Sequence, residues 1–223
     1  MRLNIKPDPD FTNIIKVLKR QEPSRTVFFE LFADSKAEFT ILEMLGELKT
    51  EEKAILEKED FFYWNPDYIK THIRYQYLLG YDYINVEALG FNFVDLVHKS
   101  TAETKEGKRA YLQSTDYEIS SYSDFEAFSW LNMKAIDYSP FENAKKIMPE
   151  GMKIIGRFSG ILENVMWLLG AENINYLLYD EPRLVDDTFE AVASRIINYF
   201  DNIASFDHVG AIIMGEDISN SSS

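Results

Sequence analysis

The sequence contains no cysteine. This absence excludes disulfide bonds, a thiolate nucleophile and any metal site built on cysteine within this chain. It is compatible with a reducing compartment. Any catalytic or metal-binding chemistry of the chain therefore has to come from other side chains.

Long hydrophobic runs are also missing. No apolar run approaches the roughly 20 residues that a membrane-spanning helix needs. The first residues, MRLNIKPDPDF, lack the apolar core of a signal peptide. We expect a soluble, cytoplasmic protein, and we expect the polar end at residues 218–223 to be mobile.

Positive charge is scarce, because 23 Lys and Arg residues face 37 Asp and Glu residues and the net charge is −14. Such an acidic surface repels phosphate backbones and anionic lipids. We therefore expect no nucleic-acid and no membrane partner, and we expect a small-molecule substrate.

Helical and strand-like segments alternate along the chain, and 46% of the residues are apolar, which is enough for a sizeable core. Strands are predicted at 26–34, 82–90, 153–159 and 208–217. Helices are predicted at 11–20, 35–58, 66–80, 139–148, 161–169 and 182–205. Between them, 108–122 favours a small β-excursion, and 123–131 a short helical turn capped by Ser123.

This alternation predicts an α/β fold with a parallel sheet and helices packed outside it. Open doubly wound sheets and closed eight-stranded barrels both fit the rhythm. A dinucleotide-binding sheet is disfavoured, because the first strand-like stretch, FELFAD at 29–34, contains no glycine for a phosphate loop.

Polar side chains lie at or near the carboxyl end of each predicted strand, where parallel α/β folds bind their ligands. They are Glu30 and Asp34, Asn85 and Glu87, Arg157 and Ser159, with Glu163 just beyond, and Glu216 and Asp217. We expect Glu87, Glu216 and Asp217 to be catalytic, because carboxylates crowded in a pocket raise one another's pKa and serve as acids and bases. We expect Glu30, Asn85, Arg157, Ser159 and Glu163 to bind the substrate. For any one of these residues, a solvated first loop position is an equally good interpretation.

Histidine offers no metal site. His72 lies in a predicted helix and favours a packing or surface role, His98 has no partner at metal-ligand spacing, and His208 precedes its strand. No pair has the i, i+4 spacing of a helical zinc site. A Ser–His–Asp triad is unsupported as well, since no Gly-x-Ser-x-Gly elbow occurs.

Two stretches carry a family resemblance, GMKIIGRFSGILENVMWLLG at 151–170 and LYDEP at 178–182. With the segments 24–34, 78–90 and 122–130, they resemble the uroporphyrinogen decarboxylase superfamily, in the branch that borders the corrinoid-dependent methyltransferases. The resemblance covers nearly the whole chain. It implies a TIM-type (β/α)₈ barrel, with the active cleft at the carboxyl ends of the strands.

Members of that family are longer, so the resemblance implies a partial barrel in a single domain, 1–223, that stops after about the fifth strand. The unclosed sheet would leave open edges, through which we expect self-association. A fragment, a truncated product and a chain completed by a second copy all remain open.

Two departures from the family bear on function. Decarboxylases of the family grip the substrate's propionates with arginines on the first strand, whereas FFELFAD at 28–34 has none. Related methyltransferases hold zinc with His and Cys and act with a corrinoid partner. This chain has no cysteine, so no cofactor is assignable in it.

We expect methyl transfer between a corrinoid protein and a small methylated substrate or thiol. Uroporphyrinogen decarboxylation in tetrapyrrole synthesis and a non-catalytic truncated barrel are the alternatives.

Overall fold

A computed structural model describes residues 6–31, 33–50, 52, 66–94, 98–104, 107–112 and 117–216. The chain divides into two compact units. Unit 1 comprises Met1–Leu89, Ile136–Arg157 and Phe200–Ile213, and unit 2 comprises Gly90–Ala135, Phe158–Tyr199 and Met214–Ser223.

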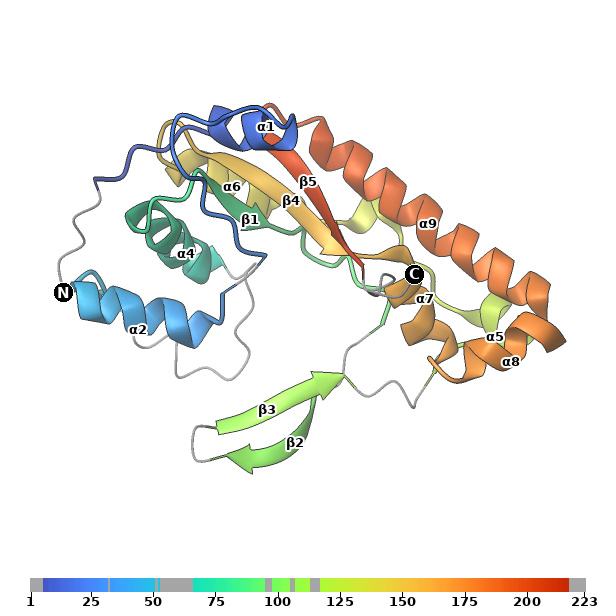
Figure 1. Ribbon diagram of the computed structural model, residues 1–223. Coiled ribbons are helices and arrows are strands. Elements are labelled where there is room, and N and C mark those ends of the chain that lie inside the picture. Colours follow the sequence, from blue (N-terminus) through green and yellow to red (C-terminus); the bar gives the residue numbers. More distant parts are fainter. Residues whose placement is uncertain are drawn as a thin grey trace. The chain divides into compact units, whose positions relative to one another are not determined.

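Unit 1 is built on a small parallel sheet with the strand order β1-β4-β5 (Figure 1). Its strands are β1 (Tyr83–Val86), β4 (Lys153–Ser159) and β5 (Val209–Gly215), and the last two residues of β4 and of β5 belong to unit 2. Its helices are α1 (Thr12–Leu18), α2 (Ser35–Leu45), α4 (Pro66–Leu78) and α6 (Ser139–Ile147). The α/β class and the parallel pairing predicted from the sequence are thus confirmed.

The two faces of this sheet are covered differently. Gly156 lies on a helix-covered face, where an added Cβ would stand 2.4 Å from Ile203 and 3.5 Å from Phe141. On the opposite face, Tyr83 and Ile155 form a buried cluster with Phe11, at the start of α1. Because side chains alternate along a strand, Asn85 and Arg157 share this second face.

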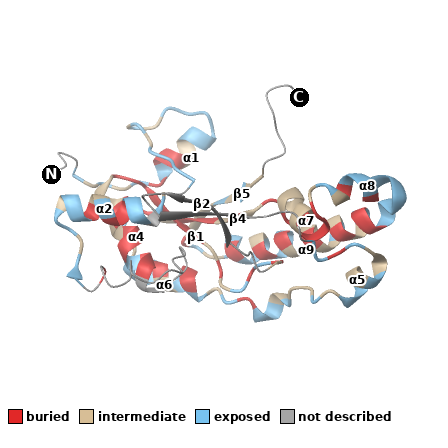
Figure 2. Ribbon diagram, turned by 90° about the horizontal axis from the view of Figure 1, so that it is seen from below, coloured by how far each residue is buried: buried red, intermediate tan, exposed pale blue. Residues whose placement is uncertain are grey.

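Unit 2 contains an antiparallel hairpin of β2 (His98–Thr104) and β3 (Gly107–Leu112). Its helical elements are α5 (Tyr122–Ala127), the 3₁₀ turn η1 (Met133–Ala135), α7 (Ile161–Leu169), α8 (Asn173–Asp180) and most of α9 (Pro182–Ala204). Along α9, Leu184, Val192, Ile196 and Tyr199 are buried at helical spacing, and Figure 2 shows this buried stripe in red. Phe91 stacks on Tyr199 with ring centroids 4.3 Å apart, which anchors the stripe.

Several predicted boundaries need correction. Residues 26–31 belong to no strand, and β1 is shorter than the predicted 82–90. The predicted helix 35–58 is interrupted after Leu45, because Gly46 adopts φ 75° and closes the helix with left-handed backbone, and the chain is helical again at Thr50 and Glu52. Residues 53–58 lie outside the described part of the chain.

The short helix expected at 123–131 begins one residue earlier, as α5. Its cap is Ser121 rather than Ser123, since the Ser121 hydroxyl accepts a hydrogen bond from the Asp124 amide. None of the helices in the described ranges is long and apolar enough to cross a membrane.

Candidate functional site

Three of the predicted site residues meet at the carboxyl ends of β1 and β4, within unit 1. Arg157 donates from Nε to Glu87 Oε1 at 2.5 Å and from Nη1 to the carbonyl oxygen of Leu31 at 3.0 Å. Asn85 donates from Nδ2 to the same Leu31 oxygen at 2.9 Å. The Leu31 carbonyl therefore joins side chains from two neighbouring strands.

The Glu87–Arg157 ion pair is largely shielded from water, with 16% of the Glu87 side chain and 22% of the Arg157 side chain exposed. Burial raises the pKa of Glu87, and the Arg157 guanidinium opposes that rise without cancelling it. A carboxyl group with a raised pKa takes and returns protons more readily near neutral pH. Glu87 also fixes the direction of the guanidinium.

Glu30 contributes mainly through its backbone. Its amide donates to the Tyr83 hydroxyl at 2.7 Å, and that hydroxyl donates back to the Glu30 carbonyl at 2.7 Å. The Glu30 side chain is hydrogen-bonded with Tyr81. Burial first, and then the nearby Glu30 carboxylate, raise the pKa of Tyr81, and burial raises the pKa of Tyr83 to about 12.

The remaining described site residues lie in unit 2, around the first turn of α7. Both carboxylate oxygens of Glu216 accept backbone hydrogen bonds, from Leu162 at 3.0 Å and from Glu163 at 3.1 Å. The Ser159 hydroxyl accepts a bond from Asn164 at 2.8 Å. Glu216 therefore satisfies amides that would otherwise lack partners at the start of the helix, where the helix dipole favours a negative charge.

This capping depends on Gly160, the residue before α7. A Cβ at position 160 would lie 2.1 Å from the Glu216 carboxyl carbon, so only glycine leaves room for that carboxylate. The N-terminus of α7 is thus occupied by a side chain of the protein itself. The predicted catalytic residue Asp217 lies outside the described residues, as does the predicted mobile end at 218–223.

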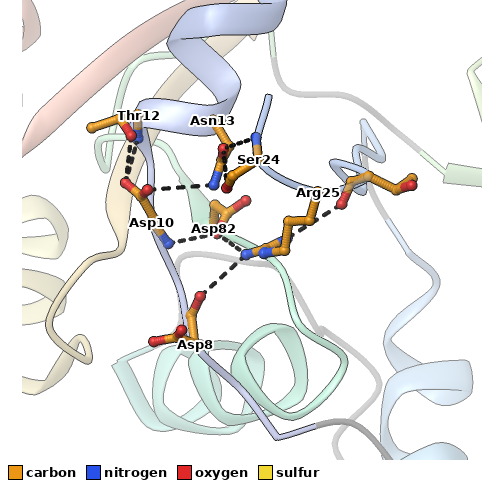
Figure 3. Close-up of polar contacts among 8 residues, drawn as sticks. Asp8, Asp10, Thr12, Asn13, Ser24, Arg25 and Asp82 are labelled. Carbon is orange, nitrogen blue, oxygen red and sulfur yellow. Dashed lines mark hydrogen bonds and ion pairs between the residues drawn. The ribbon is translucent and has the colours of Figure 1, made fainter. Parts of the chain in front are cut away.

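A second polar cluster in unit 1 lies at the amino end of β1 (Figure 3). Asp82 is fully buried, pairs with Arg25 and accepts the Asp10 amide hydrogen bond at 2.7 Å. Asp10 in turn accepts hydrogen bonds from the amide and hydroxyl of Thr12 at 3.0 and 2.7 Å. Because this end is opposite to the ligand-binding end of a parallel sheet, we interpret the cluster as structural.

Sequence reasoning missed the parts of the site that are not charged side chains. Leu31 acts through its backbone oxygen, which no sequence pattern marks. Tyr83 was detectable in principle, because it lies two residues before Asn85 and so shares its face of the strand. The hydrogen bonds of Asn164 to Ser159 and to the Gly160 carbonyl follow from helical spacing once α7 is placed.

The described histidines are engaged in packing. His72 is buried between α2 and α4, where its Nδ1 lies 3.0 Å from Glu38 Oε1, and His208 contacts Asp207 at 3.0 Å. In the described ranges, no three His, Asp or Glu side chains come together in a way that holds a metal ion. The zinc site that the resemblance implies for relatives does not fit these residues.

Comparisons with protein-family models, curated protein sequences and solved structures find no match.

Proposed function

We propose that the carboxyl end of β1 and β4 binds a small substrate, and that the protein takes part in methyl transfer between a corrinoid protein and that substrate or a thiol. The observation that carries the proposal is the meeting of Asn85 and Arg157 at one oxygen atom, with Glu87 paired to Arg157. It supports the binding of a small polar molecule where parallel α/β folds bind ligands. The choice of methyl transfer rests on the resemblance alone.

The same proposal includes a (β/α)₈ barrel of the uroporphyrinogen decarboxylase superfamily. Parallel strands joined by helices support it, because α6 precedes β4 and α9 precedes β5 in the order that a barrel requires. In this barrel, Asn85 and Arg157 would orient the substrate and Glu87 would hold the guanidinium in place. Positioning of this kind lowers the barrier by aligning the reacting groups in advance.

Uroporphyrinogen decarboxylation is the second candidate, and the charges of the described residues disfavour it. Its substrate carries many carboxylates. Arg25, the arginine nearest to the first predicted strand, is paired with the buried Asp82 at the other end of β1. At the candidate site, Arg157 is already neutralised by Glu87. A polyanion would therefore meet little unpaired positive charge there.

An activity assay with methylcobalamin separates these functions. The chain is incubated with methylcobalamin and a panel of thiols, and in the reverse direction with cob(I)alamin and small methylated compounds. The corrinoid spectrum reports the transfer. We expect the wild type to transfer the methyl group. The transfer rate should fall at least about tenfold in Arg157→Leu and should not change in the matched surface control Arg183→Leu.

A parallel incubation with uroporphyrinogen tests the second candidate through the appearance of coproporphyrinogen. Product in that incubation, with no change in the corrinoid spectrum, would replace methyl transfer by decarboxylation. A folded chain without either activity would favour the non-catalytic alternative.

A further inference from the structure

Two hydrogen-bond donors from neighbouring strands point at the carbonyl oxygen of Leu31. Asn85 Nδ2 reaches it from β1 at 2.9 Å and Arg157 Nη1 reaches it from β4 at 3.0 Å. A carbonyl oxygen has two lone pairs, so these two bonds saturate it. Glu87 holds Arg157 through Nε, so the guanidinium keeps its direction whether or not this oxygen is present.

An amide N–H and a guanidinium N–H that point at one sp² oxygen form a recognition site for carbonyl and carboxylate groups. The orientation of the Asn85 amide follows from its contacts. Its nitrogen faces two carbonyl oxygens, those of Leu31 at 2.9 Å and Glu30 at 3.5 Å, and only a donor satisfies them. The backbone of residue 31 therefore stands where the oxygen of a ligand would bind.

Residues 26–31, which we name the bridging segment, are not fixed by a strand ladder. Their sequence, TVFFEL, is typical of a strand, yet they belong to no strand and pair with no described strand. The Glu30 amide bonds to the Tyr83 hydroxyl instead of to a strand backbone. In the described sheet, β1 is an end strand, so its outer edge has no strand partner there.

The observed position of the bridging segment is incompletely satisfied. Asn85 is 4% exposed, and its Oδ1 is buried without a hydrogen-bond partner among the described residues. Three apolar side chains of the segment remain exposed, Phe28 at 46%, Phe29 at 52% and Leu31 at 43%. A buried acceptor without a donor and exposed large apolar groups both cost free energy. This cost offsets part of the stabilisation that the segment gains where Phe29 stacks on Tyr83 and Val27 packs against the buried cluster.

We propose that the bridging segment moves between the observed position and an edge-strand position beside β1, and that its departure opens the donor pair to a carbonyl or carboxylate oxygen of a small substrate. In the observed position, the Leu31 carbonyl holds the site closed as an internal substitute for that oxygen. This inference rests on the proposed function for the location of the substrate, and it adds the chemical group that the site recognises.

Nuclear magnetic resonance of the full chain tests it with acetate and acetamide as probes. The side-chain amide of Asn85 and the ¹³C-labelled carbonyl of Leu31 are followed together. We expect the chemical shifts of both signals to follow the same saturating curve as the probe concentration rises, because the probe accepts the two hydrogen bonds that the Leu31 carbonyl gives up. A preference for acetate or acetamide tells whether the group is charged or neutral. Methylammonium, which has no acceptor oxygen, and chloride at equal ionic strength should cause neither change.

The variant Asn85→Asp removes the amide donor and should weaken probe binding by about tenfold or more. Asn132→Asp is its control, because Asn132 is exposed and its oxygen accepts the Lys134 amide hydrogen bond, as a carboxylate also would. If circular dichroism shows that Asn85→Asp is unfolded, Arg157→Lys replaces it. Lysine keeps the charge but loses the planar second donor, so a similar weakening is expected.

Three results would overturn the inference: neither probe shifts the Asn85 amide, methylammonium shifts it equally, or the amide shifts while the Leu31 carbonyl does not. The titration requires no methyl donor. Probe binding without methyl transfer would therefore refute only the proposed function, and methyl transfer without probe binding would refute only this inference.

Discussion

Asp82 shows how one buried carboxylate makes stability depend on pH. Burial raises its pKa, and the Asp10 amide and Arg25 only partly oppose this rise. Because the folded pKa lies above the unfolded one, the folded state binds the proton more tightly. Asp82 therefore contributes stability that is complete below its unfolded pKa and is lost as the pH rises through its folded pKa.

We predict that the free energy of unfolding of the wild type, measured relative to Asp82→Asn, falls as the pH rises above about 3.9, the ordinary pKa of aspartate, and through the raised folded pKa. The asparagine variant lacks this titrating group, and the other ionisable groups are the same in both proteins. Urea denaturation at several pH values measures the difference. A difference that is constant or grows with pH would contradict the raised pKa.

Glu216 was expected to be catalytic, but its two oxygens accept the amides of Leu162 and Glu163. We predict that Glu216→Gln destabilises the protein by about 1 kcal/mol, since it removes one acceptor and the negative charge at the helix N-terminus. Chemical denaturation measures this, with Glu126→Gln on exposed α5 as the control. Full stability combined with lost methyl transfer would instead assign Glu216 a catalytic role.

At the scale of elements, α9 offers a matched pair of neighbouring residues. Ile196 is 1% exposed, whereas Ile197 is 56% exposed. We predict that Ile196→Ala costs about 2–4 kcal/mol through lost burial and a residual cavity. Ile197→Ala should stay within about 0.5 kcal/mol, because it removes few contacts. Equal effects in thermal or urea denaturation would contradict the observed orientation of α9.

The sequence predicted those elements whose boundaries are set by local chemistry. The bounds of β4 agree with the prediction because an apolar run is followed by Gly160, and α7 then follows directly. The bridging segment was mispredicted because its apolar, β-branched residues favour a strand, while its backbone is held by Tyr83 and Asn85 side chains from β1. Propensity does not reveal such long-range hydrogen bonds.

The candidate site was predictable to a similar extent. Parallel strands bring their carboxyl ends to the same edge, which correctly placed Asn85, Glu87 and Arg157 together. The role of Glu216 was not predictable, because its contact with α7 joins residues 54 positions apart. That contact requires the pairing of β4 with β5, which the sequence does not specify residue by residue.

At the scale of the whole molecule, the net charge of −14 predicts a response to salt. Like charges spread over one chain repel one another, and this repulsion weakens as the Debye length falls from about 30 Å at 0.01 M to about 8 Å at 0.15 M salt. We predict a melting temperature that rises with NaCl over this range. A melting temperature that falls would indicate that attractive ion pairs dominate instead.

Among the described strands, β5 is at the edge of the sheet, and its Ile212 and Met214 are 39% and 45% exposed. An edge strand with exposed apolar side chains favours pairing with another chain. We predict concentration-dependent self-association in light scattering, and a reduced average mass for Ile212→Lys. A wild type that stays monomeric at every concentration would contradict this use of the edge.

The contact at Leu31 has a genetic consequence, because the acceptor belongs to the main chain. Every amino acid supplies the same oxygen, so a codon change at this position alters the bulk above the site without deleting the atom itself. Inherited variation in the hydrogen bonds that hold Leu31 at the site is therefore expected at codons 85, 87 and 157, and at codon 83, whose hydroxyl bonds the Glu30 backbone. Laboratory evolution aimed at opening it should accumulate changes there first.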